Sequence, residues 1–453
     1  MHGFDETTER ILRRASEYVR ERLTIDPVPL DHRGIAAELD RDAPSLIGDG
    51  PTDPDIVFDQ YERVLGPAVI SVDSPRFLSF IPAAPTKASM LFDMVVSASS
   101  LNGTSWLESA GAIHAENHVL RVVADLAGLP ATAGGVFLSG GSAGNLSALT
   151  VARDVARHRR GDRARMRILA SEQTHSSVAN TARILDCDIV TVPAVDSRMV
   201  GAEVERVIAS DEDPSTFCAV VATAGTTNAG IVDDLVGVGE VARKHGLWFH
   251  VDAAYGGAAL LSRRISARFA GIDRVDSMIV DPHKWLFAPL DCAILLYREP
   301  RLAKGVHTQN ASYLDSIHVD DSEWNPTDYA YHLTRRARGL AMWFSLATHG
   351  IDAYRDAVDR ALDVATHAAE RIVSTPYLEL VREPDLSVVM FRRRGWDERR
   401  YTRWSEQLLA DGIGFVLPSR WDGEPILRLA IVHPGTSEAI IDEILGTLAH
   451  APT

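Results

Sequence analysis

The chain has 453 residues, 46% of them hydrophobic, so it is long enough for two or three packed regions instead of one simple core. Its 46 basic and 62 acidic residues give a formal net charge of -16, which argues against a surface that binds nucleic acid or an anionic membrane. Any anionic ligand must therefore be held by local donors, not by the overall field of the protein.

The cysteines and the N-terminus favour a cytoplasmic protein. Cys187, Cys218 and Cys292 are few and unclustered, which indicates a reducing compartment without a disulfide framework or a cysteine-based metal site. The first residues lack the basic-then-apolar pattern of a signal peptide, and no apolar run approaches the roughly 20 residues that span a bilayer. The 16 histidines show no HExxH or paired-ligand spacing, so no metal site is predicted.

The chain begins with a predicted helical segment. Apolar residues recur at helical spacing among charges over residues 7–23, and Pro27 and Pro29 end this helix. Residues 30–75 indicate further helix broken by Asp, Gly and Pro. Because such a segment has little core of its own, we expect residues 1–65 to pack on another surface, such as a partner subunit.

Residues 66–340 are predicted to form a large α/β domain. Helical stretches alternate there with short apolar strands, and this rhythm is typical of a largely parallel sheet, which binds ligands at the carboxyl ends of its strands. The predicted helices are residues 112–127, 143–159 and 233–245, and the predicted strands are residues 135–138, 167–170, 218–222, 247–251, 278–280 and 293–297.

Residues 341–453 are predicted to form a smaller α/β domain. Before it, residues 303–333 are polar and uneven, a long loop of the kind that often serves as a lid. A long helix is expected from about residue 340. Strands at 387–391 and 426–431, a helix near 402–411 and a final helix from Ser437 complete the prediction.

Two predicted strands each deliver one charged residue at their carboxyl ends. The strand at 278–280 is followed by Asp281, Pro282, His283 and Lys284, and Asp252 follows another strand 32 positions earlier. A lysine at such a place can form a Schiff base with an aldehyde, and an aspartate can keep a pyridine nitrogen protonated. These are the two anchors that a pyridoxal phosphate (PLP) enzyme needs.

Three further strand ends carry polar residues that suit the same cofactor. Residues 138–145 are rich in glycine and open a helix, so the backbone at Gly141 and the hydroxyl of Ser142 can hold a phosphate. This segment is neither a Walker loop nor a GxGxxG fingerprint. His175 can stack its imidazole on the cofactor ring, and Thr223 can donate to the phenolic oxygen or to a substrate carboxylate.

Taken in chain order, these motifs resemble the PLP-dependent group II amino acid decarboxylases of the aromatic-L-amino-acid decarboxylase type. The resemblance covers roughly residues 65–345 and implies an α/β protein of PLP-dependent fold type I, the aspartate aminotransferase-like fold. The matching motifs are Pro75-Arg76-Phe77, Ser105-Trp106, Ser139-Gly140-Gly141-Ser142, Thr174-His175-Ser176, Gly225-Thr226-Thr227, His250-Val251-Asp252-Ala253-Ala254-Tyr255, Asp281-Pro282-His283-Lys284-Trp285 and Arg335-Arg336-Ala337-Arg338-Gly339-Leu340.

The resemblance assigns a role to each residue of the expected site. It implies that Lys284 carries the Schiff base, that Asp252 pairs with the pyridinium nitrogen and that His175 stacks on the ring face. Relatives often have Asn where this chain has Asp281, and a carboxylate is a poor direct partner for phosphate unless it is protonated or bridged. Ala254 is expected to line the ring, His283 to lie beside the Schiff base, and Gly141, Ser142 and Asp281 to lie near the phosphate.

The resemblance also supplies a proton donor. Tyr313 matches a tyrosine on a mobile loop that, in such enzymes, protonates the reacting carbon after CO2 leaves. Related aldehyde-forming enzymes have Phe at this place, so a tyrosine favours simple decarboxylation to the amine. An intact set of Lys284, Asp252, His175 and Tyr313 argues against a non-catalytic relative that keeps only the fold.

The substrate is expected to be an aromatic L-amino acid. The resemblance places Phe80, Pro82, Asn102 and Thr104 around the side-chain pocket, and aromatic decarboxylases tend to have bulky apolar residues at the last two places. An acidic or aliphatic amino acid is therefore the alternative substrate. Aldehyde formation, C–C lyase chemistry and transamination are alternative reactions on the same fold. The family's subunit arrangement implies a homodimer with shared active sites and the N-terminal helix swapped onto the partner.

Overall fold

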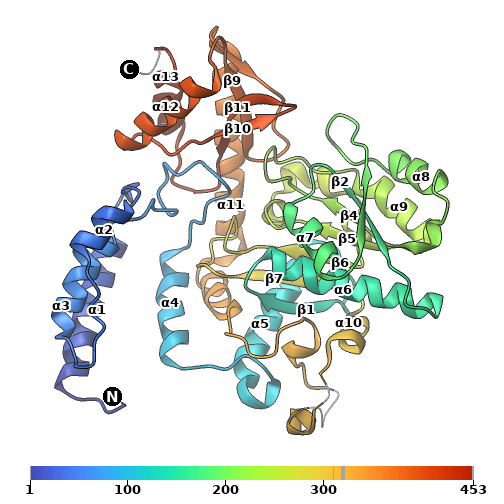
Figure 1. Cartoon of the computed structure of the whole chain (residues 1–453), viewed down its shortest axis with the longest axis horizontal. Coiled ribbons are helices and arrows are strands. Elements are labelled where there is room, and N and C mark those ends of the chain that lie inside the picture. The colour runs from blue at the N-terminus through green and yellow to red at the C-terminus, as the bar shows by residue number, and fades with distance from the viewer. Residues whose placement is uncertain (1, 310, 318–321, 451–453) are drawn as a thin grey trace.

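The computed structural model describes residues 2–309, 311–317 and 322–450, and for Tyr313, Asp315 and Ser316 it describes the backbone alone. Two sheets organise the chain, a large central one and a smaller one near the C-terminus (Figure 1). No helix in the described part is long and apolar enough to cross a membrane.

The central sheet has seven strands in the order β1-β7-β6-β5-β4-β2-β3, and all neighbours are parallel except β7, which runs antiparallel to β1 and β6. Most of these strands are apolar runs buried along their whole length, as expected where helices cover both faces. The strands are β1 (Gly134–Leu138), β2 (Arg167–Ser171), β3 (Asp188–Val192), β4 (Phe217–Thr223), β5 (Trp248–Asp252), β6 (Ser277–Val280) and β7 (Ala293–Tyr297).

Helices pack on both faces of this sheet. One buried cluster joins α6 and α7 to one face, and a larger cluster joins α5, α9 and α11 to the other face. The helices of this region are α4 (Lys87–Ala98), α5 (Trp106–Leu126), α6 (Gly141–Arg160), α7 (Ser176–Ile184), α8 (Gly201–Ala209), α9 (Leu235–His245) and α10 (Pro300–His307).

The helix α11 (Gly339–Ser374) runs from the central body to the smaller sheet (Figure 1) and is kinked at Gly350, whose φ of +78° suits glycine. The smaller sheet is antiparallel, in the order β10-β11-β9-β8. Its elements are β8 (Leu378–Leu380), β9 (Val388–Arg393), α12 (Glu398–Ala410), β10 (Pro418–Trp421), β11 (Glu424–Ala430) and α13 (Glu438–Thr447).

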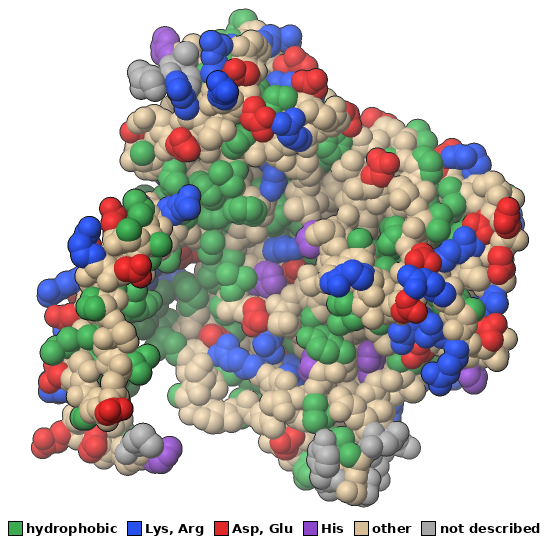
Figure 2. Space-filling view, in the orientation of Figure 1, with side chains coloured by type: hydrophobic (Ala, Val, Ile, Leu, Met, Phe, Trp, Pro, Cys, Tyr) green, Lys and Arg blue, Asp and Glu red, His purple; other side chains and the backbone are tan. Residues whose placement is uncertain are grey.

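The N-terminal helices form a separate layer beside α4 (Figure 1). They are α1 (Glu6–Thr24), α2 (Ala36–Asp42) and α3 (Pro54–Gln60), and none of their residues is buried. Leu12 and Ile56 are about half exposed. Figure 2 shows hydrophobic side chains along these helices and on the body across an open gap. Within the chain α1 contacts α3, where the ring centroids of Tyr18 and Phe58 lie 6.2 Å apart, and this contact leaves the apolar faces of the helices unburied.

The comparison with the predicted elements confirms the fold class and most of the strands. The edge strand β3 (Asp188–Val192) was missed because it is short and Thr191 interrupts its apolar residues; in the structure it is mostly half-exposed. The helices α4, α7 and α8 were missed as well. The predicted long loop at 303–333 is wrong at its start, where α10 extends to His307, and at Pro326–Asp328, which form a buried helical turn.

Candidate active site

A cavity of about 230 Å³ lies at the carboxyl edge of the central sheet. The polar residues that follow β1, β2, β4, β5 and β6 converge on it, because parallel strands place their carboxyl ends at one edge. Of the residues predicted from the sequence, it is lined by Gly141, Ser142, His175, Thr223, Asp252, Ala254, Asp281, His283 and Lys284.

Lys284 and Asp281 form an ion pair in this cavity. The Nζ atom of Lys284 lies 2.9 Å from Oδ2 of Asp281, whose other oxygen is buried without a hydrogen-bond partner. His283 accepts a hydrogen bond at Nδ1 from the backbone N–H of Cys292 (3.0 Å), so its proton sits on Nε2. Burial lowers the pKa of His283, which keeps this imidazole neutral beside Lys284.

The glycine-rich turn after β1 forms an anion cradle at the start of α6. Gly140 caps this 20-residue helix without a side-chain hydrogen bond, so the first backbone N–H groups are free to bind an anion. A Cβ atom at Gly144 would lie 2.6 Å from Cγ2 of Ile279, so only glycine lets the helix approach β6 this closely. The cradle therefore offers backbone donors that fit a phosphate.

Asp252 lies across the cavity with its carboxylate held on both oxygens. Its Oδ1 accepts from the backbone N–H of Ala254 (3.1 Å), and its Oδ2 accepts from Nδ2 of Asn145 (3.0 Å). His175 caps α7 and accepts at Nδ1 from the backbone N–H of Ser177 (3.2 Å), which fixes the plane of its ring.

Thr223 supplies an unsatisfied polar atom. Its Oγ1 is buried and has no hydrogen-bond partner, and the residue lines the cavity. A buried hydroxyl without a protein partner is rare in folded proteins, and this one is available to bond a ligand in the cavity. An amine for a Schiff base, a carboxylate for a ring nitrogen, an imidazole for a ring face, backbone donors for a phosphate and this hydroxyl together fit PLP.

Arg428 is a residue of this region that the sequence analysis missed. It lies on β11, is only 8% exposed, and donates from Nη1 to the carbonyl of Thr227 (3.1 Å), a residue that lines the cavity. Burial lowers its pKa to about 10, and in the described part of the chain no carboxylate pairs with it. The sequence signal that could have identified Arg428 is its place inside the apolar run 426–430. A charge buried in such a run needs a partner, which can be a ligand.

Four predicted residues are not brought to this cavity. Phe80 is 59% exposed, Pro82 is buried elsewhere, and neither lines it. Asn102 and Thr104 bond to each other, Oγ1 of Thr104 donating to Oδ1 of Asn102 (2.5 Å), and also lie outside it. The side chain of Tyr313 lies outside the described residues. The roles predicted for these five residues stay predictions.

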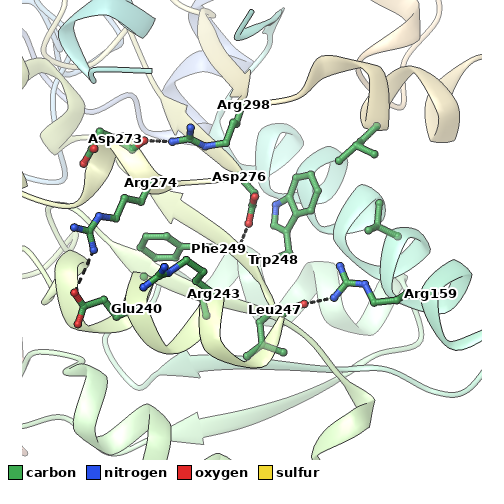
Figure 3. Close-up of a pocket in the computed structure, with 15 residues that line it drawn as sticks. Arg159, Glu240, Arg243, Leu247, Trp248, Phe249, Asp273, Arg274, Asp276 and Arg298 are labelled. Carbon is green, nitrogen blue, oxygen red and sulfur yellow. Dashed lines mark hydrogen bonds and ion pairs between the residues drawn. The ribbon is translucent and has the colours of Figure 1, made fainter. Parts of the chain in front are cut away.

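A second, larger cleft of about 730 Å³ lies at the opposite edge of the sheet (Figure 3). Its charged groups are mostly paired within the protein. Arg298 donates to the carbonyl of Val275 (2.9 Å), and Arg274 forms an ion pair with Glu240 (3.3 Å). Asp276 accepts from the backbone N–H of Phe249 (2.7 Å). This cleft lies at the amino edge of the parallel strands, whereas such sheets bind ligands at the carboxyl edge. The smaller cavity, at the carboxyl edge, is therefore the candidate active site.

Two buried histidines predict acid lability. Burial lowers the pKa of His250 to about 4 and that of His332 to about 3, whereas both protonate near pH 6.5 in the unfolded chain. Since the folded pKa lies below the unfolded pKa, their contribution to stability is complete above pH 6.5 and is lost as the pH falls towards about 4. Between about pH 7.5 and about pH 5.5 each of these two histidines should lower the free energy of unfolding by roughly 1.3 kcal/mol. In urea unfolding, the difference between the two pH values should therefore change by about that amount in His332→Phe relative to the wild type. An unchanged difference in the variant would exclude His332 as a cause.

The fold and the cavity define a PLP-dependent enzyme of fold type I. Comparison with known proteins gives the particular family: residues 38–394 match the model described as "Pyridoxal-dependent decarboxylase conserved domain". The chain belongs to this family and is a PLP-dependent amino acid decarboxylase, as the sequence analysis predicted.

Individual relatives agree with the family. The chain is 32% identical over 355 residues to an aromatic-L-amino-acid decarboxylase of Bacillus atrophaeus, covering 76% of this chain and 73% of that protein. It is 31% identical over 443 residues to an L-2,4-diaminobutyrate decarboxylase of Rhizobium meliloti, covering 94% and 83%. A crystal structure of Oryza sativa TDC with PLP and tryptamine superposes with a TM-score of 0.90 at 25% identity, covering 99% of each chain.

Proposed function

We propose that this enzyme removes the α-carboxylate of an aromatic L-amino acid as CO2 and releases the amine. The convergence of Lys284, Asp252, His175 and the α6 cradle on one cavity carries this proposal. The similarity to the Bacillus atrophaeus aromatic-L-amino-acid decarboxylase supports the choice of substrate. The similarity to the Oryza sativa structure that holds tryptamine supports it as well.

The residues divide the work as follows. Bound PLP supplies a ring that accepts the electrons left behind when CO2 departs. Asp252 would keep the ring nitrogen protonated, and His175 would hold the ring from one face. Lys284 would supply the amine that anchors the cofactor, and Arg428 would hold the substrate carboxylate. Tyr313 delivers the proton that replaces the carboxylate.

Arg428→Gln is expected to lower kcat/KM by about 10²-fold, because the substrate carboxylate loses a charged partner in a buried site. PLP binding should be unchanged, since Arg428 contacts the cavity wall at Thr227 and not the cradle. Steady-state CO2 release and a PLP titration measure the two quantities. A variant that loses PLP affinity and keeps its KM would remove Arg428 from substrate binding.

In air-saturated buffer Tyr313→Phe is expected to lower amine formation by about 10²-fold or more, because the proton donor is lost while CO2 still leaves. The product should shift towards the aldehyde and ammonia, with dissolved O2 as the two-electron oxidant and hydrogen peroxide as its reduced product. Product analysis by chromatography measures amine, aldehyde and ammonia. Tyr331→Phe, at a half-exposed tyrosine further along the chain, is the matched control. Unchanged amine output from the Tyr313 variant would exclude it as the donor.

We also propose a cytoplasmic homodimer in which the N-terminal segment, residues 1–65, packs on the partner chain. The absence of buried residues on α1, α2 and α3 supports this, as do the half-exposed Leu91, Met94 and Val95 on α4. The three free buried cysteines support a reducing compartment. Within this dimer Phe80, Pro82, Asn102 and Thr104 border the pocket of the partner chain.

Sedimentation equilibrium tests the dimer. The wild-type protein should have twice the mass of one chain, and Leu12→Glu should shift it towards the monomer and lower activity in parallel. Glu17→Gln on the same helix is the control, because its charge change does not touch the apolar stripe. A monomeric wild-type enzyme with full activity would contradict the arrangement.

A polar network favours a second candidate, a smaller substrate with a cationic side chain. Nδ2 of Asn102 donates to Oε1 of Glu108 (2.6 Å), and Oγ of Ser105 donates to Oε2 of Glu108 (2.8 Å). This carboxylate beside the predicted pocket segment suits an ammonium group, and one relative is an L-2,4-diaminobutyrate decarboxylase. CO2 release measured with L-tryptophan, L-tyrosine, L-phenylalanine and L-2,4-diaminobutyrate decides between the two. A kcat/KM highest for the diamino acid would overturn the aromatic substrate, and no CO2 from any of the four would overturn both.

A further inference from the structure

A buried chain of hydrogen bonds crosses the central sheet from Trp248 to Asp252. Nε1 of Trp248 donates to Oγ of Ser277 (2.7 Å), which lies 2.8 Å from Nδ1 of His250. Nε2 of His250 lies 2.8 Å from Oδ1 of Asn145, and Nδ2 of Asn145 lies 3.0 Å from Oδ2 of Asp252. The indole of Trp248 lines the cleft at the far edge of the sheet (Figure 3), so the chain connects the two edges.

The direction of every hydrogen bond is fixed from the Asp252 end. Both oxygens of Asp252 accept, Oδ1 from the backbone N–H of Ala254 and Oδ2 from Asn145. Asn145 therefore turns its NH2 group towards Asp252 and its carbonyl oxygen towards His250. That oxygen can only accept, so Nε2 of His250 carries the proton. Burial keeps His250 neutral by lowering its pKa, which leaves Nδ1 as an acceptor for the hydroxyl of Ser277.

The other end of the hydrogen-bond chain is consistent with this direction. An indole N–H can only donate, so Trp248 fills one lone pair of Ser277, whose hydroxyl proton stays available for Nδ1 of His250. The five residues are between 0% and 6% exposed, so the donors and acceptors that link them bond to one another and not to water. Each side chain therefore has one satisfied orientation.

A branch of the same chain reaches His175. Nδ2 of Asn145 also lies 2.9 Å from Oγ of Ser177, and this hydroxyl lies 2.8 Å from Nδ1 of His175. Asn145 thus donates one amide hydrogen to Asp252 and the other to Ser177. One buried amide sets the orientation of the ring-nitrogen partner and of the ring-stacking imidazole together.

We propose that Asn145 and His250 are positioning residues for the decarboxylation: as a neutral Nε2–H tautomer, His250 fixes the amide of Asn145, and Asn145 holds Asp252 and His175 in the orientations that bind the cofactor ring. This inference rests on the assignment of PLP to the cavity. It adds two residues that do not act on the substrate themselves. His250 reaches the cofactor only through Asn145 and Asp252.

The chemical contribution can be separated from simple packing by two probes. The first is PLP, and the second is its 1-deaza analogue, which has a carbon in place of the ring nitrogen. If His250 acts through the pair formed by Asp252 and the ring nitrogen, its loss should weaken PLP much more than the analogue. A residue that only supports the fold should weaken both equally.

The experiment titrates the apoprotein with each probe and follows tryptophan fluorescence. His250→Phe removes the donor to Asn145 and the acceptor for Ser277, so the amide of Asn145 is free to present its oxygen to Asp252. We expect its affinity for PLP to fall about tenfold or more and its affinity for the 1-deaza analogue to change by less than about threefold. His250→Gln keeps a donor and an acceptor and should restore PLP affinity to within about threefold of wild type.

His307→Phe is the matched control. His307 is also buried, and its side chain makes one hydrogen bond, to the carbonyl of Ser147 (3.1 Å), which is not part of the hydrogen-bond chain from Trp248 to Asp252. It should leave both affinities unchanged. Asn145→Leu tests the same link if His250→Phe does not fold, and it should show the same preference between the probes. Equal losses for PLP and its analogue, or no rescue by His250→Gln, would overturn the inference. A wild-type protein that binds neither probe would instead overturn the assignment of PLP to the cavity.

Discussion

Replacing Lys284 with alanine is expected to abolish the visible absorbance of the PLP-loaded enzyme and to reduce CO2 release by about 10³-fold or more, because the variant has no amine to hold the cofactor or to exchange with the substrate. An absorbance scan with added PLP and an assay of CO2 release measure the two effects. The chain has four lysines, so the same substitution at a second lysine can serve as a control.

Lys244→Ala is the matched control for this prediction. Lys244 lies on the outside of α9 and pairs with Glu205 (2.7 Å), away from the cavity. Its loss should leave absorbance and CO2 release unchanged. A Lys284 variant that keeps the absorbance band would place the anchor on another residue and would exclude Lys284 as the residue that binds the cofactor.

Asp252→Asn is expected to reduce kcat by about 10³-fold while the protein remains folded, because a neutral amide keeps the size of the side chain and cannot hold the ring nitrogen protonated. The backbone N–H of Ala254 still has an oxygen to bond in the variant. Circular dichroism checks the fold, and single-turnover CO2 release measures the step after substrate binding.

Asp276→Asn is the control for Asp252→Asn. Asp276 is a carboxylate of the same sheet, but it lines the cleft at the opposite edge and accepts from the backbone of Phe249. The control should keep wild-type kcat. An Asp252 variant with unchanged kcat would show that the reaction does not need a charged partner at the ring nitrogen.

The strand ends were predictable from the sequence, and the network between them was not. Lys284 and Asp252 follow apolar runs, and parallel strands bring such ends together whatever their loops do. The chain through Asn145 and His250 depends instead on the register of β5 and β6, in which His250 pairs with Ser277, and on side-chain rotamers. Neither the strand register nor the rotamers can be predicted from a local pattern of residues.

Residues that belong to an assembly are harder to predict still. Asn102 and Thr104 were assigned to the pocket from resemblance alone. In the single chain Thr104 donates to Asn102 and Asn102 donates to Glu108, and neither residue lines the cavity that contains Lys284. Arg428 shows the converse case. It was visible as a charge in the apolar strand β11, but its approach to Thr227 depends on how the smaller sheet docks on the larger one.

The lack of buried residues on α1, α2 and α3 has a consequence for how the enzyme behaves on dilution. In the proposed dimer these helices are ordered by the partner, so association and the completion of each pocket are a single equilibrium. Specific activity then becomes a function of enzyme concentration, and an inactive variant that still associates would lower the activity of the wild-type chains mixed with it.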